Sequence, residues 1–518
     1  MTVPSLSSDA SGGSAVSSGY VIGVDAGTGG CKVTVLGSEG TIHASVYVPY
    51  PSIYANPGWV EQDPEQWREA ALSGVAQALS GFSAAQRAAV RGLIFSAPHH
   101  IAVLLDADGR PVRNAIMWND QRSGEQVRRL QEQHGDLILD VTRNNVSATW
   151  TLAHLAWLTD HEPEVRSKAV RMVYMKDYLR SAFSGGDTLT DYIEGGGTLY
   201  WDLRRREWSR ELLEIVGFAD VAQPEIVTPT TVVGTVTPAA AERTGLPLDA
   251  LVYVGTADSA AEIYAAGGVR PGDAVVKLAT AGNLQVVTDA LPSTTRPLTY
   301  EHPIDGQYYV NTATNFAAAS FRWFRESFVD ELAAERGVES YEITEADVSG
   351  VPAGSRGLMF HPYLNGERSP LWDPKQRGSF FGVTPVHDRA HFTRAVMEGV
   401  AMSIRHASKD HDRFPEKARL VGGGANSVTW GQIVSDVLGI PVEVPELADS
   451  SAGTALLAAT ELGWFSDVAE AAESAQNILR AHEPNPEAVA VYEERFALYT
   501  EYEEATRSIA HRLADSGA

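Results

Sequence analysis

The chain has 518 residues, of which 44% are hydrophobic and 21% are charged, close to ordinary globular usage. Its length predicts about three domains at roughly 150 residues each, and two large domains fit equally well. A disordered polymer, a collagen-like fibre and a small disulfide-stabilised protein are excluded, because a chain of this size and composition can bury a full hydrophobic core.

The net charge is −25, from 41 Lys and Arg against 66 Asp and Glu. Proteins that bind nucleic acid usually show the opposite balance because they neutralise phosphates, and anionic membranes repel an acidic surface. We therefore expect neither partner. A phosphate ligand is still allowed, because backbone amides in glycine turns bind phosphate with few Lys or Arg side chains.

Cys31 is the single cysteine, so no intramolecular disulfide can form and a reducing compartment is indicated. No apolar run reaches the roughly 18 residues of a membrane-spanning helix. The opening residues also lack the basic and then apolar layout of a signal peptide. These features predict a cytoplasmic protein.

The first half is predicted to open with a flexible tail, residues 1–19, rich in Ser, Gly and Ala. Strands are predicted over 20–25, 32–36 and 42–48, which form a β-meander around a glycine-rich turn. The Asp-Pro-Glu-Gln run at 63–66 predicts a helix start, with Asp at the N-cap and Pro at the first helical position.

Further strands are expected at 93–95, 103–105 and 112–117, the last two joined as a hairpin by the turn at 106–109. The strand at 252–254 leads into a small-residue turn and a helix. Strands and helices alternate along the chain, which favours an α/β architecture.

A second strand-and-turn unit, residues 274–283, repeats the pattern of residues 21–30. Two such units, one in each half, predict a duplicated core with a ligand between the halves. Near the end of the chain, Tyr492, Phe496 and Tyr499 fall at helical spacing and predict a packing stripe on a C-terminal helix.

Asp25 ends the first predicted strand and is followed by Ala26-Gly27-Thr28-Gly29-Gly30. Glycine lets backbone N–H groups turn toward an anion, and Asp can hold Mg²⁺ through water. The segment is neither a Walker A loop nor a complete dinucleotide fingerprint. It indicates either a phosphate and metal site or a tight hairpin turn.

Three further motifs each have a functional and a structural interpretation. Asp258 follows a buried strand and could take a proton from a hydroxyl group, or could be a helix N-cap. The triple glycine at 422–424 leaves bare backbone for a ring or a phosphate, or forms a strand-to-helix turn capped by Asn426 or Ser427. In the pair at 99–100, one histidine could bind a polyol hydroxyl or be a satisfied, partly buried side chain.

Together these segments resemble the FGGY carbohydrate kinase family, in the family's order and over nearly the whole chain from Tyr20. The order of the set makes the resemblance specific, and the chain looks most like the xylulokinase branch. The runs that carry it are 21–28, 58–64 with Trp67, 118–120 with Arg122, 176–179, 255–258, 363–370, 377–382, and 422–427 with Trp430.

The resemblance implies two actin-like domains with RNase H-like cores that flank a deep cleft. The first domain would span 20–267, on the sugar and phosphate side, and the second 268–515, on the nucleotide side. It further implies transfer of the γ-phosphate of ATP, with Mg²⁺, to a hydroxyl of a sugar or polyol. A homodimer is also compatible with it.

By position, the resemblance makes Asp258 the catalytic base and a sugar contact, and Asp25 the carboxylate near Mg²⁺ and the phosphates. His99 and His100 match the family's other sugar contacts. The remaining matches are phosphate and nucleotide contacts: Thr28 and Gly29 in the first loop, Thr280 and Gly282 in the second, and Gly423, Gly424 and Asn426 at the nucleotide.

The chain departs from the family pattern at two places. Pro98 and Ile101 replace the Gln and Gly that flank the sugar contact, which leaves the identity of the sugar open, and 279–281 reads Ala-Thr-Ala in place of Gly-Thr-Ser. The expected substrate is a ketopentose, D-xylulose. The alternatives are another ketopentose, a polyol or a sugar acid, and, from a different class, an actin-like nucleotide switch without sugar kinase activity.

Overall fold

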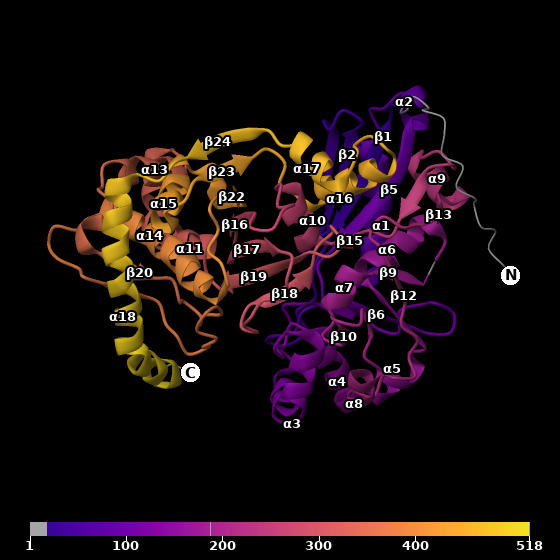
Figure 1. Ribbon diagram of the computed structural model, residues 1–518, viewed down its shortest axis with the longest axis horizontal. Helices are drawn as coiled ribbons and strands as arrows, with labels where there is room; N and C mark the ends of the chain where they lie inside the picture. Colours follow the sequence, from indigo (N-terminus) through magenta and orange to yellow (C-terminus); the bar gives the residue numbers. More distant parts are fainter. Residues whose placement is uncertain (1–17, 187, 517–518) are drawn as a thin grey trace.

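The computed structural model describes residues 18–516 except residue 187. The tail expected over 1–19 therefore lies almost wholly outside the described residues. The described chain forms two large mixed sheets, one in each half, with helices packed on them (Figure 1). The α/β architecture predicted from the sequence is confirmed. No helix in the described part of the chain is long and apolar enough to cross a membrane.

The first sheet has the strand order β13-β14-β5-β1-β2-β3, with β15 also paired to β5. Strands β1 to β3 form the predicted antiparallel meander, while β5 runs parallel to β1 and β14 parallel to β5. The bounds are β1 (Tyr20–Ala26), β2 (Gly30–Gly37), β3 (Ile42–Pro49), β5 (Val90–Ala97), β13 (Val232–Thr235), β14 (Leu251–Tyr253) and β15 (Thr256–Ala257).

The second sheet has the order β18-β19-β17-β16-β22-β23-β24. Strands β16, β17 and β19 are antiparallel, β22 runs parallel to β16 and β23 parallel to β22, which repeats the topology of the first sheet. The duplicated core predicted from the two strand-and-turn units is confirmed. The bounds are β16 (Ala274–Leu278), β17 (Gly282–Thr288), β18 (Leu298–Glu301), β19 (Tyr308–Thr314), β22 (Ala418–Val421), β23 (Val442–Pro445) and β24 (Ile478–His482).

Short strands pair outside these sheets, and they correct one expectation. The hairpin predicted around 106–109 is present but short: Leu105 forms an antiparallel bridge with Pro111, and Val112 N–H donates to Leu104 O at 2.9 Å. Beyond these residues the flanking apolar strands pair with other partners. The pairs are β4 (Glu61–Gln62) with β7 (Ala115–Ile116), β6 (Ala102–Leu105) with β8 (Arg171–Tyr174), β9 (Leu189–Asp191) with β12 (Glu225–Val227), β10 (Trp201–Asp202) with β11 (Glu207–Trp208), and β20 (Met359–His361) with β21 (Ser379–Phe381).

The helix predicted to start near residue 63 is α1, whose N-cap is Asp63 and whose first residue is Pro64. The helices of the first half are α1 (Pro64–Ala78), α2 (Ala84–Ala88), α3 (Gly124–Thr142), α4 (Thr151–His161), α5 (Pro163–Lys168), α6 (Met175–Ser184), α7 (Tyr192–Gly196), α8 (Arg210–Ile215), α9 (Pro238–Thr244) and α10 (Asp258–Ala265). Those of the second half are α11 (Ala318–Phe328), α12 (Asp330–Arg336), α13 (Ser340–Ser349), α14 (Arg389–Ala407), α15 (Val428–Leu438), α16 (Ser450–Glu461), α17 (Val468–Ser474) and α18 (Pro486–Ser516).

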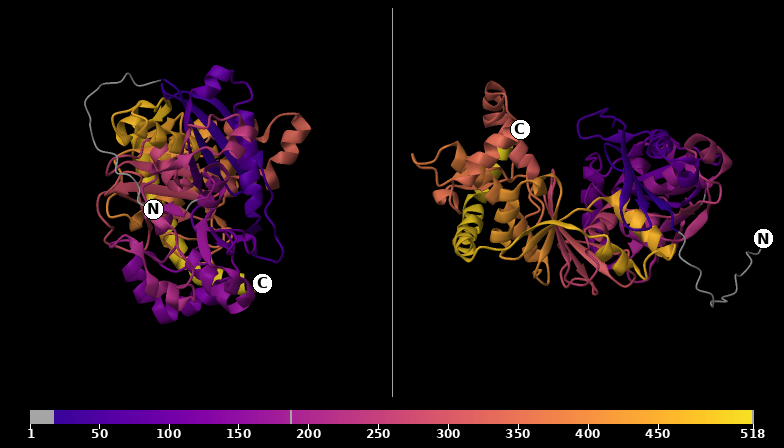
Figure 2. Two further views of the ribbon diagram at one scale, coloured as in Figure 1. Left: turned by 90° about the vertical axis from the view of Figure 1, so that its right-hand side faces the viewer. Right: turned by 90° about the horizontal axis from the view of Figure 1, so that it is seen from above.

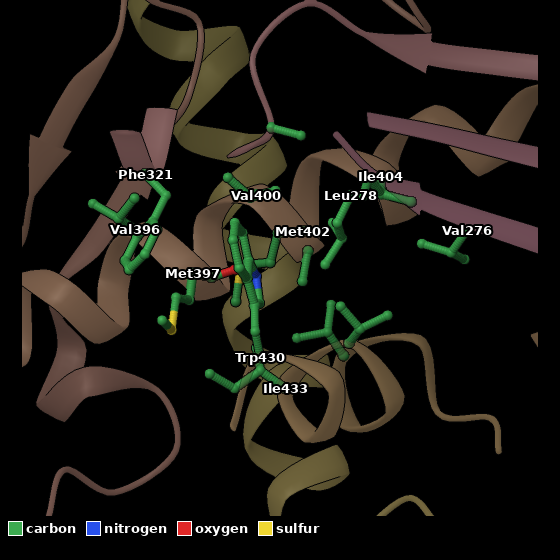
Figure 3. Close-up of a cluster of buried hydrophobic side chains, with 14 of the residues drawn as sticks. Val276, Leu278, Phe321, Val396, Met397, Val400, Met402, Ile404, Trp430 and Ile433 are labelled. Atoms are coloured by element: carbon green, nitrogen blue, oxygen red, sulfur yellow. The ribbon is translucent and has the colours of Figure 1, made fainter. Parts of the chain in front are cut away.

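The core of the second half surrounds Trp430 of α15 (Figure 3). Its indole Nε1 donates to Met397 O at 3.1 Å, and its ring lies 5.2 Å from that of Phe321. On α18, Tyr492 and Tyr499 are fully buried, which confirms the predicted packing stripe.

Helix α16 belongs to the second half of the sequence but packs on the first sheet, against β1, β5 and α10. Figures 1 and 2 show this yellow helix beside the indigo strands. A Cβ on Gly23 of β1 would lie 1.8 Å from Ser451 O, and one on Gly453 would lie 2.1 Å from Ala261 O. Glycine at both positions therefore allows α16 to lie directly on the backbone of β1 and of α10.

This close approach makes Gly453→Ala a test of the packing. A Gly to Ala change inside a helix normally stabilises it by up to about 1 kcal/mol. Here the added methyl overlaps backbone, and we expect a loss of about 1–3 kcal/mol in the free energy of unfolding. Calorimetry should show a lower Tm for Gly453→Ala. The control is Gly124→Ala at the start of α3, where an added Cβ meets nothing within 4 Å. Equal Tm values for Gly453→Ala and the wild type would contradict the inferred packing.

Candidate functional site

Three parallel strands of the first sheet end side by side and bring two predicted site residues together. In the register of β1, β5 and β15, Asp25 lies opposite Ser96, and Ser96 lies opposite Thr256. Ser96 Oγ donates to Asp25 Oδ1 at 2.7 Å. Asp258 comes two residues after Thr256, at the start of α10. Asp25 and Asp258 therefore share the carboxyl edge of the sheet, where ligands of open α/β sheets bind.

Asp258 is the first residue of α10, and the N-cap of that helix is Ala257, so the N-cap interpretation of Asp258 is wrong. Its Oδ1 accepts a hydrogen bond from Ser259 N at 2.6 Å. Burial raises the pKa of Asp258 to about 6, the ammonium of Lys277 lowers it, and Glu262 raises it. A carboxyl group with such a pKa is mostly ionised at neutral pH and basic enough to accept a proton.

Asp25 lies in strongly anionic surroundings. Burial raises the pKa of Asp25 to about 8; Asp258 contributes to this rise and the hydrogen bond from Ser96 opposes it. Asp449 and Glu262 raise this pKa further. Like charges this close disfavour ionisation unless a cation joins them.

Lys277 of β16 is a site residue that the sequence analysis missed. Its Nζ lies 2.6 Å from Glu262 Oε2 on α10 and so joins the second sheet to the first half. Burial alone would lower the pKa of Lys277, but Glu262, Asp258 and Asp25 around it raise that pKa overall. Lys277 therefore brings positive charge from the second half to the carboxylates of the first.

The first predicted phosphate loop is a tight turn between β1 and β2, in which Gly27 N–H donates to Gly30 O at 2.9 Å. Thr28 Oγ1 accepts a hydrogen bond from Trp118 Nε1 at 3.1 Å, and Gly29 is exposed. The hairpin interpretation thus describes the backbone correctly. Phosphate binding by Thr28 and Gly29 stays a prediction.

The second predicted loop follows β16, and the glycine segment lies against it. A Cβ on Gly422 would lie 2.7 Å from Leu278 O, at the end of β16. Arg322, an exposed residue of α11 that the sequence analysis also missed, donates from Nη2 to Thr280 Oγ1 at 3.2 Å. Gly282 is the first residue of β17. The roles of Thr280 and Gly282 at the phosphates stay predictions.

The glycine segment 422–427, which follows β22, forms the capped strand-to-helix turn that was one of its two interpretations. Ser427 Oγ accepts from Trp430 N at 3.0 Å and so caps α15. Gly423 and Asn426 are exposed, whereas Gly424 packs against Trp430. Capping by Ser427 does not exclude that the preceding glycines also contact a ligand. The nucleotide contacts predicted for Gly423, Gly424 and Asn426 therefore stay predictions.

The two histidines differ in how their polar atoms are satisfied. His100 Nδ1 donates to Gly197 O, and its Nε2 lies 3.5 Å from Tyr300 OH on β18. His99 packs its ring 4.8 Å from that of Tyr300, and its Nε2 has no hydrogen-bond partner. Burial lowers the pKa of His100 to about 3 and that of His99 well below its usual value, so both imidazoles are neutral.

Two runs that carried the family resemblance form one buried cluster near this edge. Arg122 pairs with Asp120 at 2.8 Å and with Glu61 at 2.7 Å, and its guanidinium lies 3.8 Å from the ring of Trp59. Asp120 Oδ2 also accepts from Val60 N. The runs 58–64 and 118–122 therefore hold each other in place beside the first turn.

The donor groups present fit Mg²⁺ as a partly hydrated ion that is shared with a phosphate ligand. In residues 18–516, leaving out 187, no three His, Cys, Asp or Glu side chains are grouped to hold a metal ion. Mg²⁺ usually keeps several waters and takes one or two carboxylates together with substrate phosphates. Asp25, with Asp258 and Glu262 nearby, offers that kind of carboxylate.

Family models match both halves of the chain. The N-terminal domain of the FGGY family of carbohydrate kinases matches residues 20–264, and the C-terminal domain of that family matches residues 282–462. Together these matches cover most of the chain.

Individual relatives agree with the family models. The chain is 33% identical over 486 residues to the xylulose kinase of Bacillus subtilis, covering 93% of this chain and 96% of that one. It is 26% identical to the gluconokinase of the same organism, covering 83% and 85%. The structure of a gluconate kinase from Lactobacillus acidophilus superposes with a TM-score of 0.87 at 25% identity, covering 95% and 98%. The chain therefore belongs to the FGGY family of carbohydrate kinases, with the actin-like two-domain fold, and is an ATP-dependent phosphotransferase.

Proposed function

We propose that this kinase transfers the γ-phosphate of ATP to a hydroxyl group of a ketopentose, D-xylulose, and releases D-xylulose 5-phosphate. The observation that carries the proposal is the placement of Asp258, within electrostatic reach of both Asp25 and Lys277. The similarity to a xylulose kinase over nearly the whole chain supports the ketose. The similarity to gluconate kinases makes a sugar acid the second candidate.

In this mechanism Asp258 is the general base. Its carboxylate accepts the proton of the sugar hydroxyl as that oxygen attacks the γ-phosphorus in line with the leaving ADP. Ser259 N–H and the Lys277 ammonium stabilise the carboxylate before it takes the proton. Phosphoryl transfer depends mainly on positioning and charge neutralisation, so the remaining side chains orient the two substrates and exclude water.

Asp25 would hold Mg²⁺, which when bound neutralises charge on the phosphates. Thr28 and Gly29 would contact the phosphates from the first half, and Thr280 and Gly282 from the second. The exposed backbone at Gly423 and Asn426, together with Gly424, would contact the nucleotide. Arg322, already bonded to Thr280, adds a guanidinium at the second loop.

The division into domains at 20–267 and 268–515 also stays a proposal. The gap between the two family matches, at 264 and 282, supports it, whereas α16 and α17 lie beside the first sheet. A cytoplasmic location and a homodimer complete the proposal.

A sugar panel tests the function directly. We expect purified protein with Mg²⁺ and ATP to release ADP with D-xylulose and much more slowly with D-gluconate, measured in a coupled assay. A panel of other ketopentoses and polyols completes the comparison. A nucleotide switch would instead hydrolyse ATP slowly at one rate whatever sugar is added, and that result would reject the kinase proposal.

The base is tested by Asp258→Asn, which keeps the size of the side chain and removes its basicity. We expect kcat to fall by about 10²- to 10⁴-fold, the usual contribution of a general base. The Kd for ATP, measured by calorimetry, should stay within a few-fold of the wild type. A variant with near-normal kcat would remove Asp258 from this role.

Asp25→Asn should abolish turnover. It should also raise the Tm of the ligand-free protein by a few degrees, on the order expected when the free energy of unfolding rises by a few kcal/mol. In the fold Asp25 has a pKa of about 8, whereas the ordinary value for an aspartate is 3.8, so the folded state holds a proton that the unfolded chain releases. Between about pH 4 and pH 8 the unfolded chain ionises Asp25 while the folded protein keeps it protonated, so the free energy of unfolding falls progressively as the pH rises. Asn cannot ionise in either state and avoids this cost.

The increase in Tm should consequently be larger at pH 8 than at pH 5. Thermal unfolding in EDTA at both pH values measures it, with Asp140→Asn, an exposed carboxylate on α3, as the control. A Tm change in Asp25→Asn that is the same at both pH values would contradict the raised pKa.

A further inference from the structure

Helix α7 lies where the proposed base, the histidine pair and the second half meet. It packs against β15, which leads into Asp258, and against β18, which carries Tyr300 (Figure 1). The residue after the helix, Gly197, lies against His99, and a Cβ there would come within 2.8 Å of the His99 ring. Side chains of α7 therefore reach the space around the proposed sugar site.

Glu194 of α7 is buried and lacks hydrogen-bond partners. Its side chain belongs to a residue that is 1% exposed, and neither carboxyl oxygen has a partner among the described residues. His99, 4% exposed, likewise has an unpartnered Nε2. Leaving a buried polar atom unsatisfied costs about 1–3 kcal/mol, and buried polar atoms in native proteins normally have partners. Two such groups on adjoining elements indicate that a ligand supplies the missing partners.

Lys176, the cation that acts on Glu194, is already paired with other carboxylates. Lys176 Nζ lies 2.7 Å from Asp177 Oδ1 and 3.1 Å from Asp191 Oδ1, so two carboxylates engage this ammonium. Burial raises the pKa of Glu194 well above its usual value; Lys176 opposes this, and Asp191, Asp177 and Asp258 add to it. These surroundings favour the neutral carboxyl form of the side chain, which has one O–H donor and an acceptor oxygen.

We propose that Glu194 is a specificity-determining residue of the sugar site, which together with His99 binds hydroxyl groups of a neutral sugar and disfavours a sugar acid. The inference deepens the proposed kinase function and rests on it. A hydroxyl group both donates and accepts, which matches a neutral carboxyl group and a neutral imidazole. The carboxylate of a sugar acid only accepts, and it would lie near Asp191 and Asp258 as a further negative charge.

The test separates sugar binding from stability. In Glu194→Met the polar atoms are lost at nearly constant size, so the KM for D-xylulose should rise about 10- to 100-fold. The KM for ATP should stay within about threefold. Because an unsatisfied buried group is replaced by an apolar one, the Tm of the ligand-free variant should equal or exceed that of the wild type. In Glu194→Gln, which keeps a donor and an acceptor, the KM for the sugar should stay within about threefold.

Glu398 provides a matched control, because it is equally buried but fully partnered. Its carboxylate accepts from Gly354 N, Ser355 Oγ and Tyr492 OH and pairs with Arg394 at 2.7 Å. Glu398→Gln should lower the Tm without changing the KM for the sugar. The preference for D-xylulose over D-gluconate, as a ratio of kcat/KM, should narrow at least tenfold in Glu194→Met and not in Glu398→Gln.

Three results would overturn the inference: an unchanged KM for the sugar in Glu194→Met, a parallel loss of sugar and ATP binding with a lower Tm, or a wild-type preference for D-gluconate. The last result would point to Arg368, a half-buried guanidinium in electrostatic reach of Tyr300, as the partner of a carboxylate. Failure of the kinase proposal looks different, since the wild type then releases ADP at one slow rate whatever sugar is added. Calorimetric binding of D-xylulose, compared between wild type and Glu194→Met, then still decides the role of Glu194.

Discussion

The site depends on the balance of charge between the two halves of the chain. The first half brings three carboxylates close together, Asp25, Asp258 and Glu262, and the second half contributes the ammonium of Lys277. Buried like charges raise one another's pKa, so this arrangement is favourable only with bound protons or with added positive charge. One lysine offsets part of the excess and keeps the pKa of Asp258 near 6, while Asp25 remains near 8. A metal ion bound at Asp25 would neutralise the negative charge that Lys277 does not offset.

The distance between the two aspartates is held by backbone packing, since no hydrogen bond joins their side chains directly. Helix α16 lies on β1 at Gly23 and on α10 at Gly453, so it sets α10, which begins with Asp258, against the strand that carries Asp25 near its end. Because α16 belongs to the second half of the sequence, both halves contribute to the position of these two carboxylates. This explains why bare glycine is required at these two contacts.

Local pattern predicted much of the fold. The meander, the α1 start at Asp63, the second strand-and-turn unit and the aromatic stripe of α18 all follow from residues close in sequence. The hairpin around 106–109 is shorter than predicted, because apolar strands on both sides of a turn do not reveal how far they pair with each other and where distant strands take over. Lys277, Arg322 and Glu194 were missed for the same reason. Their partners lie on other elements, and a lysine in a strand or a glutamate in a short helix carries no sequence signal of what it faces.

The proposed role of Glu194 explains why its surroundings differ from those of Glu398, although both side chains are buried. Glu398 has a hydrogen bond or an ion pair at each oxygen, so its burial is compensated within the protein. Glu194 has none, although the ion pairs of Lys176 with Asp177 and Asp191 lie beside it. A fold that satisfies one buried glutamate completely and leaves another without partners beside its proposed catalytic base gives up stability at that position. Substrate hydroxyl groups are the partners that would restore it, and they are present only when the site is in use.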